Sequence, residues 1–536
     1  MRSRDDFFWL SLLTLVYLLF WVPVIDVHPP LSTGDNGKDL YAFWLTSQGK
    51  WPYRDYWWPY GPLMPFYYAF WFLVGGVNLV SIRIGLAIIY FLCSLLVYRT
   101  LRLLTSGAIA FLSSLAFLSF RMGWTYNHIG VLPFLLLSIL CLWKFFLTAK
   151  IQWGYFGVLA LAGMALVKIS GGITSFAVFL ASLLLYQGYL KLSHPGKALG
   201  WKHFILLPSL FGVVVFGTYG FLFRGLSRNW IAQCLLLASL GPRRSVPPPW
   251  MHLKHLVLWF TVWDRSRLFW LAAVLLFGGV GLWCLGRRKT EGVDRRVFGF
   301  IVGSLLLFIP ANPSDYFFQE GLIYRFDFWV FPILVLFLGL SAEWISVLFS
   351  RKMKLGLGIF LFFTLLWQPW KNLREASAWH TPERYLGFPQ GRIYAGGPLS
   401  DVEVLRETRR FIVEHTTPDQ EIFAAPYEPL YCFLSGRRQA VREIHILEGI
   451  PISDEQEEAM IRQLEIKQIR YVVLSNRYRS KEISVGDFGI TYAKKLARYI
   501  SENYRVVQTF GPWEEGGQAV KVFERGARGE KLNLLS

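Results

Sequence analysis

Runs of apolar residues long enough to cross a bilayer recur through the first 370 residues and limit the possible folds of this chain. A transmembrane helix needs about 20 predominantly apolar residues. The candidate spans lie at 7–25, 82–98, 106–120, 128–143, 153–170, 172–190, 204–223, 268–285, 297–311, 326–349 and 355–370. The whole chain is 54% hydrophobic, as expected of a membrane protein. The pattern predicts a polytopic α-helical membrane protein with about 11 transmembrane helices.

Two apolar runs need separate interpretation. The first run is followed by 26-DVHPPLSTG-34, which lacks the small-residue cleavage site of a signal peptide, so we expect a retained span. The run 64–80 is broken by Gly75 and Gly76, and we expect it to form a helix at the membrane interface.

Positive charges on the loops indicate the orientation. With the N-terminus in the cytoplasm, the cytoplasmic loops hold 17 Lys and Arg in 54 residues, and the external loops hold 13 in 109. Cytoplasmic loops of membrane proteins carry the excess of positive charge. The net charge of +19 is therefore explained by this bias and by contact with anionic membrane lipids, without a nucleic-acid partner. We predict a multi-pass protein of the inner (plasma) membrane.

After about residue 371 the sequence becomes polar and predicts a second domain, over 372–536. Eleven spans place this domain outside the cytoplasm. The segment 453-SDEQEEAMIRQLEIKQ-468 opens with a capping Ser and acidic residues, which is typical of a helix start. Short β-like runs lie at 421–425, 471–475, 505–510 and 520–525. We expect a soluble extracytoplasmic α/β domain that packs on the membrane domain (1–371), with no catalytic role of its own.

The first external loop, 26–62, gathers acidic and aromatic residues. A helix is expected to begin at Asp35 and to end before Gly49, which places Asp35 and Asp39 on one face. Asp35 has two interpretations that the sequence leaves open. It is a catalytic carboxylate, or it caps the helix while Asp39 provides a favourable first-turn charge.

Other polar residues are expected on the same side of the membrane. Asn127 and His128 suit a sugar hydroxyl or a carboxylate, or are hydrogen-bonded within the fold. Lys168, at the end of an apolar span, needs a protein carboxylate, a path to the surface or a ligand phosphate. Arg325 has the same alternatives. The remaining candidates are Tyr324 beside Arg325, and Arg243 and Arg244 in the basic external loop 224–267, which would bind phosphate or lipid headgroups.

These candidates share one face although none is specific alone. Cations, carboxylates and aromatic rings next to an apolar groove suit a substrate that has a lipid tail, a phosphate and a sugar. The substrate-binding candidates are Asp39, Tyr41, Asp55, Tyr60, Asn127, His128, Lys168, Arg243, Arg244, Tyr324 and Arg325.

Short motifs lie in and after the first external loop, at the end of one span and at a late span: Asp35, Tyr41, Gly49, 52-PYRD-55, 61-GPLMPFYY-68, Lys168 and 324-YRFDFWVFP-332. These motifs resemble those of the GT-C membrane glycosyltransferases. The resemblance is to the branch of the protein O-mannosyltransferases, the aminoarabinose transferase of lipid A and the Rgt-type lipopolysaccharide glycosyltransferases.

The resemblance implies a hexosyl- or pentosyltransferase of the cell envelope. Such enzymes move a sugar from a polyprenyl-phosphate donor to a lipid, glycan or protein acceptor at the outer leaflet. It implies that Asp35 is the base that deprotonates the acceptor, and that Lys168 and Arg325 hold the donor phosphate. Many relatives have Asp-Glu where this chain has Asp35-Asn36, and an acidic residue where it has Asn127-His128. No metal-binding residues are assigned, and a divalent metal remains possible as a cofactor.

Other functions use similar residues. A transporter or flippase of lipid-linked sugars would favour charges at mid-membrane and internal repeats. An O-antigen polymerase or ligase would centre on a large basic external loop, and 224–267 is such a loop. A non-catalytic subunit of an envelope complex is a further alternative.

Overall fold

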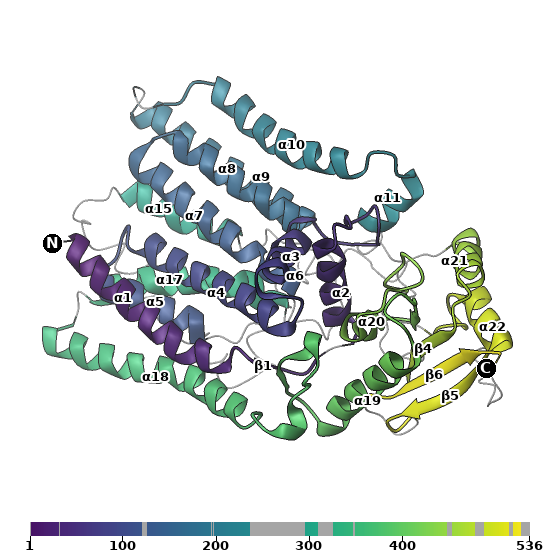
Figure 1. Ribbon diagram of the computed structural model, residues 1–536. Coiled ribbons are helices and arrows are strands. Elements are labelled where there is room, and N and C mark those ends of the chain that lie inside the picture. The colour runs from purple at the N-terminus through teal and green to yellow at the C-terminus, as the bar shows by residue number, and fades with distance from the viewer. Residues whose placement is uncertain are drawn as a thin grey trace.

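The computed structural model describes residues 2–31, 33–119, 126–194, 196, 198–235, 295–308, 325–346, 349–446, 453–476, 487–513 and 518–526. Apolar helices form a bundle in the first two thirds of the chain, and a small sheet with its own helices forms the C-terminal part (Figure 1). The bundle helices are α1 (Arg2–Trp21), α4 (Leu79–Leu101), α5 (Gly107–Ser119), α6 (Tyr126–Ile129), α7 (Val131–Thr148), α8 (Gln152–Val167), α9 (Ile169–Ser193), α10 (Lys202–Leu222), α15 (Arg295–Phe308), α17 (Arg325–Ser346) and α18 (Arg351–Ser377).

Helices occur at every predicted span that the structure describes, and the span at 268–285 lies outside the described residues. Within the described ranges, five helices are long and apolar enough to cross a membrane: Arg4–Val24, Leu79–Leu101, Tyr126–Thr148, Ile169–Ser193 and Lys202–Leu222. The count of eleven full-length spans is therefore not confirmed. The 13 residues of α5 extend only about 20 Å, less than the roughly 30 Å hydrocarbon core.

Two short helices follow α1, and the first of them carries residues of the candidate site. After the turn η1 (Val22–Val24) and the strand β1 (Val27–His28), α2 runs over Asp35–Ser47. The predicted helix from Asp35 to before Gly49 is thus confirmed. The run 64–80, predicted to lie at the interface, overlaps α3 (Leu63–Gly75) and the first two residues of α4. α3 packs against α2 and α4. Whether α3 lies at the membrane surface stays a prediction.

The C-terminal part contains a four-stranded mixed sheet in the order β3-β4-β6-β5. Its strands are β3 (Phe423–Ala425), β4 (Tyr471–Ser475), β5 (Tyr504–Phe510) and β6 (Val520–Arg525). β3 and β4 are parallel, with Phe423 opposite Val472, and β6 is antiparallel to both of its neighbours. All four predicted strand segments are found.

Helices and turns surround this sheet: η4 (Pro382–Arg384), η5 (Pro389–Gly391), α19 (Leu399–His415), α20 (Pro429–Ser435), α21 (Asp454–Ile466) and α22 (Lys494–Asn503). The predicted Ser453 cap is confirmed, since its side chain and that of Gln456 form a capping box at the start of α21.

The C-terminal part packs directly on α2 through α20 (Figure 1). The backbone N–H of Gln439 donates a hydrogen bond to the Tyr41 hydroxyl over 2.7 Å. Gly37 lies so close to α20 that an added Cβ would be 2.6 Å from the Leu430 backbone nitrogen. The strand β2 (Tyr394–Ala395) also pairs in parallel with β1. The C-terminal part is therefore joined to the segment that holds the candidate site.

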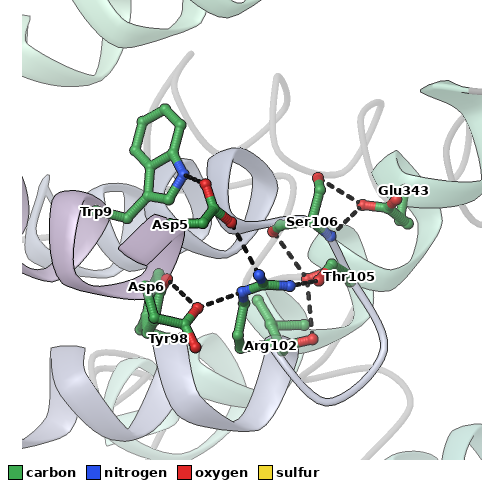
Figure 2. A network of polar contacts seen from close by, with 9 residues as sticks. Asp5, Asp6, Trp9, Tyr98, Arg102, Thr105, Ser106 and Glu343 are labelled. Atoms are coloured by element: carbon green, nitrogen blue, oxygen red, sulfur yellow. Dashed lines mark hydrogen bonds and ion pairs between the residues drawn. The ribbon is translucent and has the colours of Figure 1, made fainter. Parts of the chain in front are cut away.

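A polar network closes the opposite end of the bundle, where α1 begins (Figures 1 and 2). Arg102 contacts Asp5 at 2.8 Å and Asp6 at 2.6 Å. Glu343 of α17 accepts hydrogen bonds from the backbone and hydroxyl of Ser106, at 2.7 and 2.8 Å. We call the set Asp5, Asp6, Tyr98, Arg102, Ser106 and Glu343 the N-terminal cluster. It links α1, α4, α5 and α17.

Candidate active site

The site begins at the first turn of α2. Gly34 occupies the N-cap position, and Asp35 is the first residue of the helix. Asp35 is therefore not the N-cap, although a carboxylate in this turn is favoured by the helix dipole. Its side chain is 53% exposed, whereas every residue from Asn36 to Thr46 is buried. Asp35 is thus the one acidic side chain of α2 that reaches solvent.

Lys38 lies between the two carboxyl groups of α2. Its Nζ is 3.7 Å from Asp35 Oδ1 and 3.5 Å from Asp39 Oδ1, and the side chain is 1% exposed. Burial by itself would lower the pKa of Lys38, but Tyr60 and the two aspartates together raise the pKa above its ordinary value. The amine is therefore a fixed buried cation. We call Asp35, Lys38, Asp39 and Asn127 the α2 cluster.

Asp39 is buried and paired within the bundle. Asn127 Nδ2 donates a hydrogen bond to Asp39 Oδ1 over 2.8 Å. Burial raises the pKa of Asp39 to about 6, against the opposing effect of Lys38. The predicted residues Asp39 and Asn127 are thus brought together, and they hold each other in place.

Aromatic rings border this cluster. The Lys38 Nζ lies 4.5 Å from the centre of the Tyr60 ring and donates to the Tyr60 hydroxyl at 3.4 Å. The ring of His128, on α6, meets Tyr60 edge-on at 5.0 Å between ring centres. Two further predicted residues, Tyr60 and His128, therefore belong to the same neighbourhood.

The backbone next to Lys168 is hydrogen-bonded to the loop that carries Tyr60. It is half-buried at the junction of α8 and α9. The N–H of Gly61, next to Tyr60, donates to the carbonyl of Val167 over 2.9 Å. A Cβ at Gly61 would lie 2.0 Å from the carbonyl oxygen of Leu166, so only glycine permits this approach. The close contact places Lys168 beside the end of the first loop.

Two predicted residues have partners outside the α2 cluster. Tyr41 is buried and accepts the hydrogen bond from Gln439 already described. Asp55 is exposed and accepts a hydrogen bond from the backbone N–H of Trp51 over 2.7 Å. These contacts account for both side chains as parts of the loop structure, so substrate contact by either stays a prediction.

Arg243, Arg244 and Tyr324 lie outside the described residues. Arg325 is the first residue of α17, and only its place in that helix is described. Their predicted contacts with a donor phosphate stay predictions.

The C-terminal part contributes a residue that the sequence did not reveal. The hydroxyl of Tyr427 donates a hydrogen bond to Asp35 Oδ1. The ring of Tyr427 lies 3.9 Å from that of His445, which in turn meets Trp57 at 4.9 Å. Lys38 was also missed, although its i, i+3 spacing from Asp35 on a helix was a usable signal. Tyr427, 392 residues from Asp35, had no local signal.

The described residues contain no group of three or more His, Cys, Asp or Glu side chains that would suit a metal ion. The carboxyl groups of Asp35 and Asp39 instead have the amine of Lys38 as their shared partner. The arrangement provides an accessible carboxylate, a fixed cation and aromatic walls.

The fold is similar to that of ArnT from Cupriavidus metallidurans, a protein solved in two states. ArnT from Cupriavidus metallidurans bound to undecaprenyl phosphate aligns with a TM-score of 0.57 and 10% sequence identity, over 96% of this chain and 98% of ArnT. The apo state of the same protein aligns with a TM-score of 0.56 and 12% identity, over 96% and 97%. The sequence matches no protein-family model and no curated protein. The predicted resemblance to the branch that contains the aminoarabinose transferase is thus confirmed at the level of the fold, which is that of a multi-pass membrane protein.

Proposed function

We propose that this protein is a membrane glycosyltransferase that moves a sugar from a polyprenyl-phosphate donor to an acceptor hydroxyl, with Asp35 as the base. The observation that carries the proposal is the accessible Asp35 carboxylate, held at the start of α2 by Lys38 and Tyr427. It is supported by the likeness to ArnT, which was solved with undecaprenyl phosphate bound. A cell-envelope lipid, glycan or protein is the proposed acceptor.

The reaction requires one base and a stabilised leaving group. The acceptor oxygen attacks the anomeric carbon as the bond from that carbon to the phosphate oxygen breaks. The acceptor proton passes to Asp35, and the polyprenyl phosphate leaves with the electron pair of the broken bond. A base within hydrogen-bond reach accelerates such a step about 10²–10⁴-fold.

Cations near the leaving phosphate would stabilise its developing charge. Lys168 is the proposed donor contact among the described side chains, because the Gly61–Val167 hydrogen bond holds it beside Tyr60. Arg325 is a second proposed donor contact, although only its place as the first residue of α17 is described. Lys38 is a less direct candidate, because it already neutralises the two carboxyl groups of α2.

The proposed topology follows from the loop charges. The N-terminus lies in the cytoplasm, the α2 cluster faces the outside of the inner membrane, and residues 372–536 form an extracytoplasmic α/β domain on the membrane domain 1–371. The uneven distribution of Lys and Arg supports this orientation. A reporter active only in the cytoplasm, fused after Ser536, should be silent.

The test uses purified protein in lipid nanodiscs with a set of polyprenyl-phosphate sugars and envelope extract as acceptor. Sugar transfer and release of polyprenyl phosphate are measured by mass spectrometry. Lys168→Ala should raise the donor concentration needed for half-maximal rate, whereas Lys191→Ala, at the other end of α9, should not. If the protein moves the intact lipid-linked sugar across the membrane of proteoliposomes and transfers no sugar to an acceptor, the proposal is contradicted and a flippase is favoured.

A further inference from the structure

We infer that Tyr427 is a positioning residue through which the C-terminal part of the chain completes the active site. The inference rests on the proposed function, because it assigns a role relative to Asp35 as the base. Residues 372–536 were expected to cover the membrane domain without a part in catalysis. The hydrogen bond from Tyr427 to Asp35 Oδ1 connects them to the proposed reacting carboxylate.

Two contacts of Asp35 meet at the same carboxylate oxygen. Lys38 Nζ approaches Oδ1 at 3.7 Å, and Tyr427 donates to the same atom. Both restrain the Asp35 carboxylate through Oδ1. Positioned hydrogen bonds of this kind keep a base in its productive orientation.

Tyr427 is itself held rigidly. Tyr427 is 5% exposed, its hydroxyl donates to Asp35, and its ring centre lies 3.9 Å from that of His445. The backbone of Arg442 accepts a hydrogen bond from the Trp57 N–H over 3.0 Å, which ties the segment behind His445 to the first loop. Burial and the nearby carboxylates raise the pKa of the Tyr427 hydroxyl, so it keeps its proton and remains a donor.

The same contact should set the pH range of the reaction. The charged and titratable groups around the pair are Lys38 and Asp39 on α2, Tyr60 on the first loop, and His445 behind the Tyr427 ring. A hydrogen bond to a carboxylate favours its charged form. Without the Tyr427 hydroxyl, Asp35 should become protonated at a higher pH, and the acid limb of the rate profile should move with it.

The test is Tyr427→Phe, measured for donor KM, kcat and the pH profile of kcat. A hydrogen bond to a charged group corresponds to roughly a 10-fold or larger effect. We expect kcat to fall on the order of 10-fold, donor KM to stay within about twofold, and the acid limb to move to higher pH. The matched control is Tyr431→Phe, in the same segment, because the Tyr431 hydroxyl contacts Gln518 over 2.7 Å instead.

A second variant covers the case in which the phenylalanine protein does not fold. Incorporating 3,5-difluorotyrosine at position 427 keeps the hydroxyl but makes it a stronger donor, so the acid limb should move to lower pH. Wild-type kcat and pH profiles in these variants would overturn the inference. Asp35→Asn separates the two hypotheses. If it is inactive while Tyr427→Phe is normal, only the inference fails, and if it is active, the proposed function fails first.

Discussion

At each end of the helix bundle, a single cation is paired with two aspartates, but the contact distances differ between the two ends. In the N-terminal cluster, Arg102 contacts Asp5 and Asp6 directly at 2.8 and 2.6 Å, and Tyr98 adds a hydrogen bond to Asp6 (Figure 2). In the α2 cluster, Lys38 is more deeply buried yet lies 3.5 and 3.7 Å from its two aspartates. Arg102 thus makes short, directional contacts, whereas the charge of Lys38 lies between two carboxyl groups at longer distances.

From this difference we expect the N-terminal cluster to join helices and the α2 cluster to take part in the proposed reaction. The forked guanidinium of Arg102 binds both carboxylates and the Thr105 carbonyl, so it fixes α1 on α4. The amine of Lys38 is a compact charge that attracts the Asp35 carboxylate, and the Asp35 side chain stays exposed to solvent. We therefore expect substitutions in the N-terminal cluster to change stability, and substitutions at Asp35 to change turnover.

The largest change in the free energy of unfolding is expected for Lys38→Met. It leaves the buried Asp39 without its cation, and breaking a buried pair costs about 3–5 kcal/mol. Chemical unfolding in detergent measures the loss. Adding Asp39→Asn should restore much of the stability because no buried charge remains. Arg102→Met should cost less, since Asp5 and Asp6 are partly exposed to water. A larger loss at Arg102 would reverse the comparison.

A smaller effect, which depends on pH, is expected at Asp39. Its pKa in the folded protein is about 6, above the ordinary value of 3.8, so the folded state binds more protons between these values. The free energy of unfolding should therefore decrease as the pH rises from 4 to 6, by at most about 3 kcal/mol. Burial also raises the pKa of Glu443, so the wild-type slope contains both groups. Asp39→Asn should reduce this slope, and an unchanged slope would contradict the assignment.

Gly37→Ala should cost less stability than Lys38→Met, about 1–3 kcal/mol, because its Cβ would clash with the backbone of α20. Transfer should fall as well, since the displaced segment carries Tyr427. Gly188→Ala in α9 is the control, because nothing lies within 4 Å of its added Cβ. Equal melting temperatures for the two variants would contradict this prediction, because they would show that the added methyl group at position 37 does not clash with α20.

Local features were predictable from the sequence, and long-range contacts were not. The start of α2 at Asp35 and its end before Gly49 followed from an acidic first turn and a glycine, which adopts φ +81° here. The four strands and the Ser453 capping box also followed from local patterns. Apolar composition gave the position of α5 but not whether its 13 residues cross the membrane.

The partners within the site required the folded chain. The pairing of Asp39 with Asn127 joins segments 88 residues apart, and that of Asp35 with Tyr427 joins segments 392 residues apart. No periodicity or motif predicts such contacts, because they depend on how α6 and the C-terminal part pack against α2. The contact of the C-terminal part with Asp35 could therefore not be predicted from the sequence.

The most direct test of the account compares Asp35→Asn with Asp6→Asn in two measurements, transfer per folded molecule and free energy of unfolding. Asn removes the charge of each carboxylate at nearly constant size. Asp35→Asn should lower transfer about 10²–10⁴-fold with little change in stability. Asp6→Asn should lower stability by roughly 1–3 kcal/mol with normal transfer, because the hydrogen bonds from Arg102 and Tyr98 would no longer be made to a charged group. Near-normal transfer by Asp35→Asn would contradict its assignment as the base.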